Sequence, residues 1–124
     1  MENSNNSPMV IFSVQQSNSQ TNEQVHKELI KEGMGIEVLG SYKGEIEKSI
    51  VCDIDKLHDV LTLAKAYNQE SILVIDESNN AELIYLNGTP NESIGRMVTV
   101  TKQEALSNDA WSYRADLGLY FMCK

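Results

Sequence analysis

The residues with the clearest potential for chemistry are the two arginines, Arg96 and Arg114, among ten basic residues in a chain of 124. A guanidinium group makes planar, bidentate contacts to phosphate or carboxylate groups, which a lysine ammonium cannot reproduce. Arg114 lies within Trp111–Asp116, between aromatic side chains that could stack on a base and a carboxylate that could orient the arginine. Arg96 follows a polar loop. The pattern indicates a site for an anionic ligand.

The candidate ligand-binding residues are Arg114, Asp116, Tyr113, Trp111 and Arg96. A structural role remains open for each of them. Arg114 could simply pair with Asp116 or cover apolar surface, and Trp111 could anchor the core or an interface.

No catalytic residue, metal site or cofactor is expected. The sequence contains no GxSxG, no Gly-rich phosphate loop and no HExxH. His26 and His58 are expected to be ordinary surface or boundary residues of helices. Cys52 and Cys123 lack CxxC spacing and are expected to be reduced thiols.

Carboxylates also alternate along one predicted strand, where Glu45 and Glu47 share a face and Asp53 follows. Paired carboxylates can do acid–base work. In a chain this acidic, a solvated strand face is the simpler interpretation.

The charge balance excludes one class of partner. The net charge is −8, so the chain lacks the dense positive surface that a nucleic-acid polymer requires. No segment has the length and apolarity of a membrane span or a signal peptide, so no membrane association is expected. These features predict a cytoplasmic protein, in the cytosol of the bacterial host if it is encoded by a phage.

The predicted fold is α+β, with a small, mainly antiparallel sheet (a hairpin plus a three-strand meander) packed with two to three helices. Residues 1–20 are expected to form a polar N-terminal segment with a possible short strand at Met9–Val14. Residues 21–124 form a single α+β ligand-binding domain. Apolar periodicity and capping residues predict helices at Asn22–Glu32, Lys56–Asn68 (capped by Asp55) and Lys102–Leu106. Strands are predicted at Ile36–Tyr42, Ile46–Ile54, Ile72–Ile75, Ala81–Leu86, Met97–Thr101 and Leu117–Cys123.

Three segments of the chain resemble a family of small phage-encoded proteins that defeat the bacterial Thoeris defence system. They are Gly40–Ser49 with its Ser-Tyr-Lys-Gly-Glu run, Tyr67–Ile72, and Trp111–Asp116 with Tyr120-Phe121. The resemblance implies a sponge that sequesters a cyclic ADP-ribose isomer made by TIR-domain proteins and does not act as an enzyme. It also implies assembly from homodimers, with pockets near the subunit interface.

Other functions remain open beside this small cyclic nucleotide ligand. The alternative is an acidic protein–protein inhibitor or adaptor that occupies a basic site on a host partner. A nucleotide-cleaving enzyme is a third possibility. A homodimer or larger homo-oligomer is also expected from the residues themselves, because Leu117–Cys123 is apolar on both faces.

Overall fold

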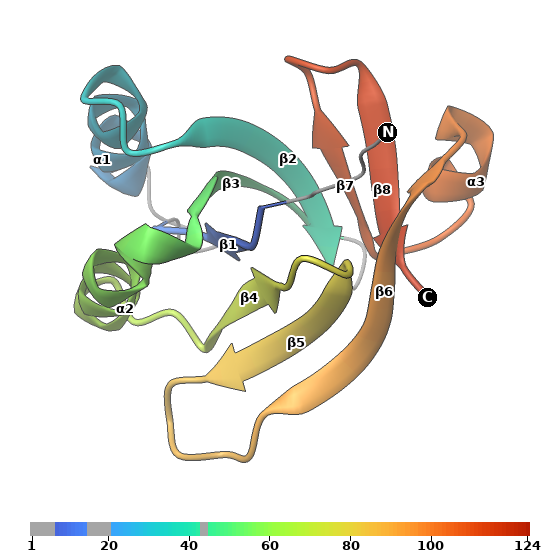
Figure 1. Ribbon diagram of the computed structural model, residues 1–124. Coiled ribbons are helices and arrows are strands. Elements are labelled where there is room, and N and C mark those ends of the chain that lie inside the picture. Colours follow the sequence, from blue (N-terminus) through green and yellow to red (C-terminus); the bar gives the residue numbers. More distant parts are fainter. Residues whose placement is uncertain (1–6, 15–20, 43–44) are drawn as a thin grey trace.

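The barrel is the main feature of the computed structural model, which describes residues 7–14, 21–42 and 45–124. Eight antiparallel strands of this described part close into a ring in the order β1-β3-β2-β7-β8-β6-β5-β4 (Figure 1). Their bounds are β1 Met9–Phe12, β2 Ile36–Tyr42, β3 Glu45–Asp53, β4 Ser71–Ile75, β5 Asn80–Tyr85, β6 Glu92–Val100, β7 Trp111–Arg114 and β8 Leu119–Cys123. An eight-stranded barrel has an interior just large enough for side chains or one small ligand.

The predicted fold class is therefore wrong, because the hairpin and the meander are parts of one closed barrel. Strand β1 joins them, since Ile11 is the register partner of both Val51 on β3 and Leu73 on β4. Strand β7, which the sequence analysis did not predict as a strand, pairs with β2 and β8 and closes the other side. Closure leaves no unpaired sheet edge, which explains why the barrel is preferred over an open sheet.

Three α-helices pack around the barrel in the described part of the chain: α1 Thr21–Lys31, α2 Leu57–Ala66 and α3 Lys102–Leu106, with a 3₁₀ turn η1 at Ile54–Lys56 before α2. Figure 1 shows α1 and α2 on one side of the ring and α3 on the opposite side. None of these helices is long and apolar enough to cross a membrane.

The predicted helix caps have different outcomes. The Thr101 hydroxyl accepts a hydrogen bond from the Glu104 N–H at 3.1 Å, which confirms it as the cap of α3. Asp55 does not cap α2, because it lies inside η1 and Lys56 occupies the cap position. The predicted turn at Lys43-Gly44 and most of the predicted N-terminal segment lie outside the described residues.

The main hydrophobic core lies outside the barrel, between its wall and the helices. Alternation along β1 and β3 turns Val10, Phe12, Ile50 and Cys52 toward α1 and α2. Burial of each large apolar side chain there contributes roughly 1.5–3 kcal/mol. The opposite face of β3, which carries Glu47, must therefore point into the barrel.

Gly95 on β6 lies against the backbone of Lys124, just beyond the end of β8. Its φ is +95°, and a Cβ there would collide with the Lys124 carbonyl oxygen. Arg96 and Lys124 exchange two backbone hydrogen bonds of 2.8 Å at this point. We expect Gly95→Ala to lower the free energy of unfolding by about 1–3 kcal/mol, because both the backbone angle and the contact become strained. Denaturant unfolding measures the loss.

The matched control is Gly88→Ala. Gly88 has a similar φ of +90°, but an added Cβ would meet open space. Its loss of stability should be the smaller of the two. Equal losses in the two variants would contradict the close contact with Lys124.

Candidate ligand site in the barrel interior

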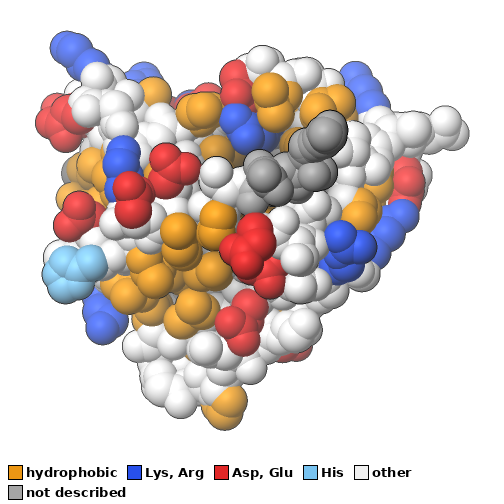
Figure 2. Space-filling model, viewed as in Figure 1, with side chains coloured by type: hydrophobic (Ala, Val, Ile, Leu, Met, Phe, Trp, Pro, Cys, Tyr) orange, Lys and Arg blue, Asp and Glu red, His pale blue; other side chains and the backbone are white. Residues whose placement is uncertain are grey.

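The barrel interior holds a cavity of about 410 Å³ whose lining includes both arginines, Arg96 and Arg114. We call it the arginine chamber. Met9, Val51 and Phe121 supply apolar surface to its wall. Acidic side chains are spread over the outer face seen in Figure 2, yet none lines this chamber among the described residues. A chain of net charge −8 thus encloses a local positive site.

Arg114 has a carboxylate partner beside the chamber. Its Nε donates to Asp116 Oδ1 at 3.1 Å, and its Nη2 donates to Oδ2 at 2.6 Å. These hydrogen bonds hold the pKa of Asp116 below its ordinary value. The side chains of Arg114 and Asp116 are 20% and 35% exposed. The ion pair between Arg114 and Asp116, which the sequence left open, is therefore present, and Arg114 also lines the chamber.

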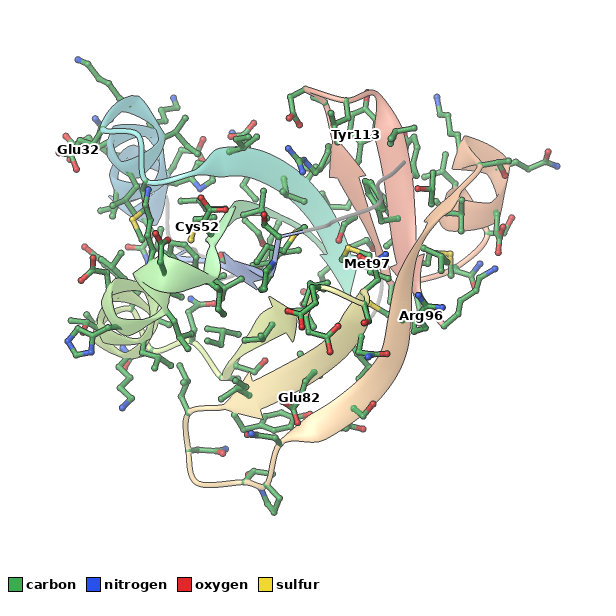
Figure 3. All side chains as sticks on the ribbon, viewed as in Figure 1. Glu32, Cys52, Glu82, Arg96, Met97 and Tyr113 are labelled. Carbon is green, nitrogen blue, oxygen red and sulfur yellow. The ribbon has the colours of Figure 1, made fainter. Side chains whose placement is uncertain are left out.

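Arg96 links β6 to a neighbouring turn at the rim of the chamber. Its Nε and Nη2 both donate to the Ser78 carbonyl oxygen, at 3.2 and 2.9 Å. This contact joins β6 to the turn between β4 and β5, and Figure 3 shows Arg96 beside Met97 on β6. The partner is a neutral carbonyl, so Arg96 can still attract an anion.

Strand alternation separates the predicted aromatic contacts from Arg114. Tyr113 and Tyr120 are register partners with ring centroids 4.5 Å apart, and Trp111 lies 5.7 Å from Tyr120. Residues 111 and 113 lie on the opposite face of β7 from Arg114, so these rings pack away from the arginine chamber, although Trp111 also belongs to the wall of a second cavity. The aromatic side chain that sequence analysis missed is Phe121, which does line the chamber.

A second cavity of about 340 Å³, lined by Glu45 and Glu47, continues the barrel interior. We call it the glutamate chamber. It shares Ile11 and Ser112 with the arginine chamber, so the two cavities are neighbours. Tyr85 adds an aromatic wall. The interior is therefore bipolar, with cations toward one end and carboxylates toward the other.

Glu47 is placed to prefer a cationic neighbour. Partial burial raises the pKa of its carboxyl group above the ordinary value, a hydrogen bond from Ser13 opposes this, and the charge of Glu45 adds to it. A cation beside the group would relieve the repulsion and the desolvation. The expected solvated face is confirmed in that Glu45 and Glu47 are both exposed, and the same two carboxylates also line the glutamate chamber.

A neighbouring cleft of about 390 Å³ lies on the other side of Arg114, with Met34, Ile36 and Lys56 in its wall. The Lys56 ammonium donates to the carbonyl oxygens of Gly33 and Met34 at 3.1 and 3.0 Å. Lys56 therefore holds the end of α1 in place, and Arg114 is the arginine that this cleft shares with the arginine chamber.

The residues with catalytic or ligand-forming side chains elsewhere are dispersed. Cys52 and Cys123 are free, and burial raises both thiol pKa values, that of Cys52 to about 11. His26 is fully buried, unlike the expected boundary residue, and its Nε2 lies 2.8 Å from Glu37 Oε1. Within 7–14, 21–42 and 45–124, no three His, Cys, Asp or Glu side chains converge as a metal site would.

One comparison with known proteins identifies a family. The family model described as the S-Adenosylmethionine lyase family matches residues 13–124. No curated protein matches the chain. The matched range contains strands β2 to β8 and nearly all the residues that line the two chambers. The chain therefore belongs to the S-adenosylmethionine lyase family.

Proposed function

We propose that the barrel interior binds S-adenosylmethionine and that the protein cleaves it. The bipolar interior is the observation that carries this proposal. S-adenosylmethionine has a carboxylate at one end, a sulfonium cation near its middle and an adenosine at the other end. The arginine chamber and the glutamate chamber meet at Ile11 and Ser112, so one extended ligand can reach both.

The contacts follow from charge and shape. The substrate carboxylate binds the Arg114 guanidinium, which presents two parallel donors. The sulfonium lies toward Glu47, whose carboxylate is stabilised by a cation. The adenosine packs against the aromatic and apolar wall that Tyr85 and Leu83 supply.

The chemistry requires few groups from the protein. When the bond between the sulfonium sulfur and the methionine γ-carbon breaks, its electron pair goes to sulfur, which leaves as a neutral thioether. If the substrate's own carboxylate attacks that carbon, the products are methylthioadenosine and a five-membered lactone, and no proton is transferred. The contribution of the site is then to hold the carboxylate close to the γ-carbon.

A second candidate is non-catalytic sequestration of a cyclic ADP-ribose isomer, which would block TIR-dependent defence. The arginine chamber favours it, since two arginines in one wall suit a diphosphate and no carboxylate is among the described residues that line this cavity. Membership of the S-adenosylmethionine lyase family is compatible with a phage anti-defence protein. In this case the protein is a sponge and no bond of the ligand breaks.

Mass spectrometry separates the two candidates. Purified protein is incubated with S-adenosylmethionine or with a TIR-derived cyclic ADP-ribose isomer, and small molecules are recovered after heat denaturation. Methylthioadenosine from the first ligand supports cleavage, whereas tight retention of the intact second ligand supports the sponge. If neither ligand is cleaved or retained, both candidates fail, and inhibition of a host protein by the acidic surface becomes the better explanation.

We also propose that the chain forms a homo-oligomer. The two apolar faces of β8 are explained by closure of the barrel, so the support now comes from the rim near Arg114. Ile36, Leu117 and Leu119 are 43%, 51% and 39% exposed there. Such apolar exposure around a pocket is typical of an interface. Light scattering should show a mass at least twice that of the 13.9 kDa chain, and a monomer at micromolar concentration would contradict the proposal.

A further inference from the structure

The carboxylate of Asp116 occupies the same donor pair of Arg114 that an anionic ligand would need. The Nε and Nη2 contacts to its two oxygens form a parallel pair, the geometry by which arginine recognises carboxylates and phosphates. Arg114 lies in the walls of both the arginine chamber and the adjoining cleft, while Asp116 lines neither. A ligand anion in the chamber therefore reaches the Nε and Nη2 donors only when the guanidinium turns away from Asp116.

The turn that carries Asp116 has backbone hydrogen bonds of its own, besides those that the Asp116 carboxylate accepts. The N–H groups of Leu117 and Gly118 both donate to the Arg114 carbonyl oxygen, at 3.1 and 2.8 Å. Gly118 has a φ of +68°, which suits the turn. The Asp116 carboxylate can consequently rotate into solvent while the β7–β8 connection keeps its shape. An ion pair with this exposure is weak, so its loss costs the fold little.

We propose that Asp116 is an internal competitor, which occupies the Arg114 guanidinium in the ligand-free protein and is displaced by the anionic group of the ligand. The inference rests on the proposed function, because it requires Arg114 to bind an anion. Asp116 then helps to set the affinity, because the protein retains only an anion that binds the Arg114 guanidinium better than the tethered Asp116 carboxylate does. Diphosphates and substrate carboxylates with additional contacts in the chamber meet this condition, and simple anions such as chloride do not.

Calorimetry with two probes, inorganic pyrophosphate and S-adenosylmethionine, tests the inference. Asp116→Asn should strengthen binding of the probe that occupies the chamber by about two- to fivefold, the worth of an exposed ion pair. Arg114→Ala should remove binding in either background. Unchanged or weaker binding by Asp116→Asn would overturn the inference and make Asp116 a residue that positions Arg114.

Carboxyl-detected NMR measures the pKa of Asp116 with and without ligand. This pKa should change if Asp116 is displaced and should stay the same if Asp116 only positions Arg114. The pKa of Asp116 is lowered by Arg114 in the free protein. Saturation with the probe should return this pKa toward its ordinary value, because the arginine is then engaged elsewhere. A pKa that stays low in the complex would contradict displacement. If neither probe binds the wild type or Asp116→Asn, the proposed function itself fails; if both bind through Arg114 and Asp116→Asn has no effect, only the competitor role fails.

Discussion

Arg114→Ala is expected to weaken binding of S-adenosylmethionine by about a hundredfold or more. Charge-assisted hydrogen bonds contribute about 1.5–3 kcal/mol each, and about 1.4 kcal/mol corresponds to a factor of ten. Arg114 supplies two such donors at the wall of the arginine chamber. The fold should survive, because the ion pair that is lost is partly exposed. Calorimetry measures the affinity, and circular dichroism checks the fold.

Arg114→Lys separates the contribution of the guanidinium geometry from that of the positive charge, because lysine keeps the charge alone. A lysine ammonium cannot make the parallel pair of donations, so this variant should recover little of the lost affinity. A folded Arg114→Ala protein that binds within threefold of the wild type would refute the assignment. The anion contact would then move to Arg96, on the other side of the same chamber.

Glu47→Gln is expected to weaken S-adenosylmethionine binding by about tenfold or more without destabilising the protein. The carboxylate that faces the sulfonium is lost, and two unit charges about 4 Å apart near a protein surface attract by roughly 4 kcal/mol, more than the ~1.4 kcal/mol of a tenfold change. The pKa of Glu47 is raised in the folded state, so folding favours its protonated form. At neutral pH the ionised group therefore opposes folding, and the neutral glutamine should leave the melting temperature equal or higher. Calorimetry and thermal unfolding measure the two effects.

The pH dependence of ligand binding and of stability is a second test of the role of Glu47. As pH falls through the raised pKa of Glu47, the wild type should lose affinity for S-adenosylmethionine, and the stability difference from Glu47→Gln should disappear. Glu82→Gln is the matched control, since Glu82 is an exposed strand glutamate like Glu47 but lines neither chamber; Figure 3 labels it on β5. A lower melting temperature for Glu47→Gln, or an equal loss of affinity in both variants, would contradict this role.

The local elements of the fold were predictable, but their closure was not. Apolar alternation located β2 and β3, and the helix with the strongest apolar stripe is α2. The barrel was missed because β7 has only four residues, Trp-Ser-Tyr-Arg, and its alternation of aromatic and polar residues is too short to mark it as a strand. Strand β1 was predicted, but its pairing with both β3 and β4 joins residues far apart in the sequence, which periodicity cannot show.

The site was predictable only in part, for the same reason. The scarcity of arginine drew attention to Arg114 and Arg96, and both line one chamber, although their contact with a ligand stays a prediction. Trp111 and Tyr113 were expected to lie beside Arg114, but the alternation of a strand that was not recognised turns their rings to the other face of β7, and Trp111 borders the glutamate chamber instead. Glu47 was expected on a solvated strand face and is exposed, but periodicity could not show that this face also lines a cavity, because the barrel closes through pairings between distant strands.

Mapping the binding of S-adenosylmethionine onto the barrel by NMR tests the central claim most directly. Titration of isotope-labelled protein should shift the backbone amide signals of Ser112 and Val51, whose residues line the interior, and leave those of the helix α3 unchanged. The same titration with Arg114→Ala should produce no such shifts at equal ligand concentration. Shifts confined to the outer face of β7 and β8, around Trp111 and Tyr120, would contradict a ligand site inside the barrel.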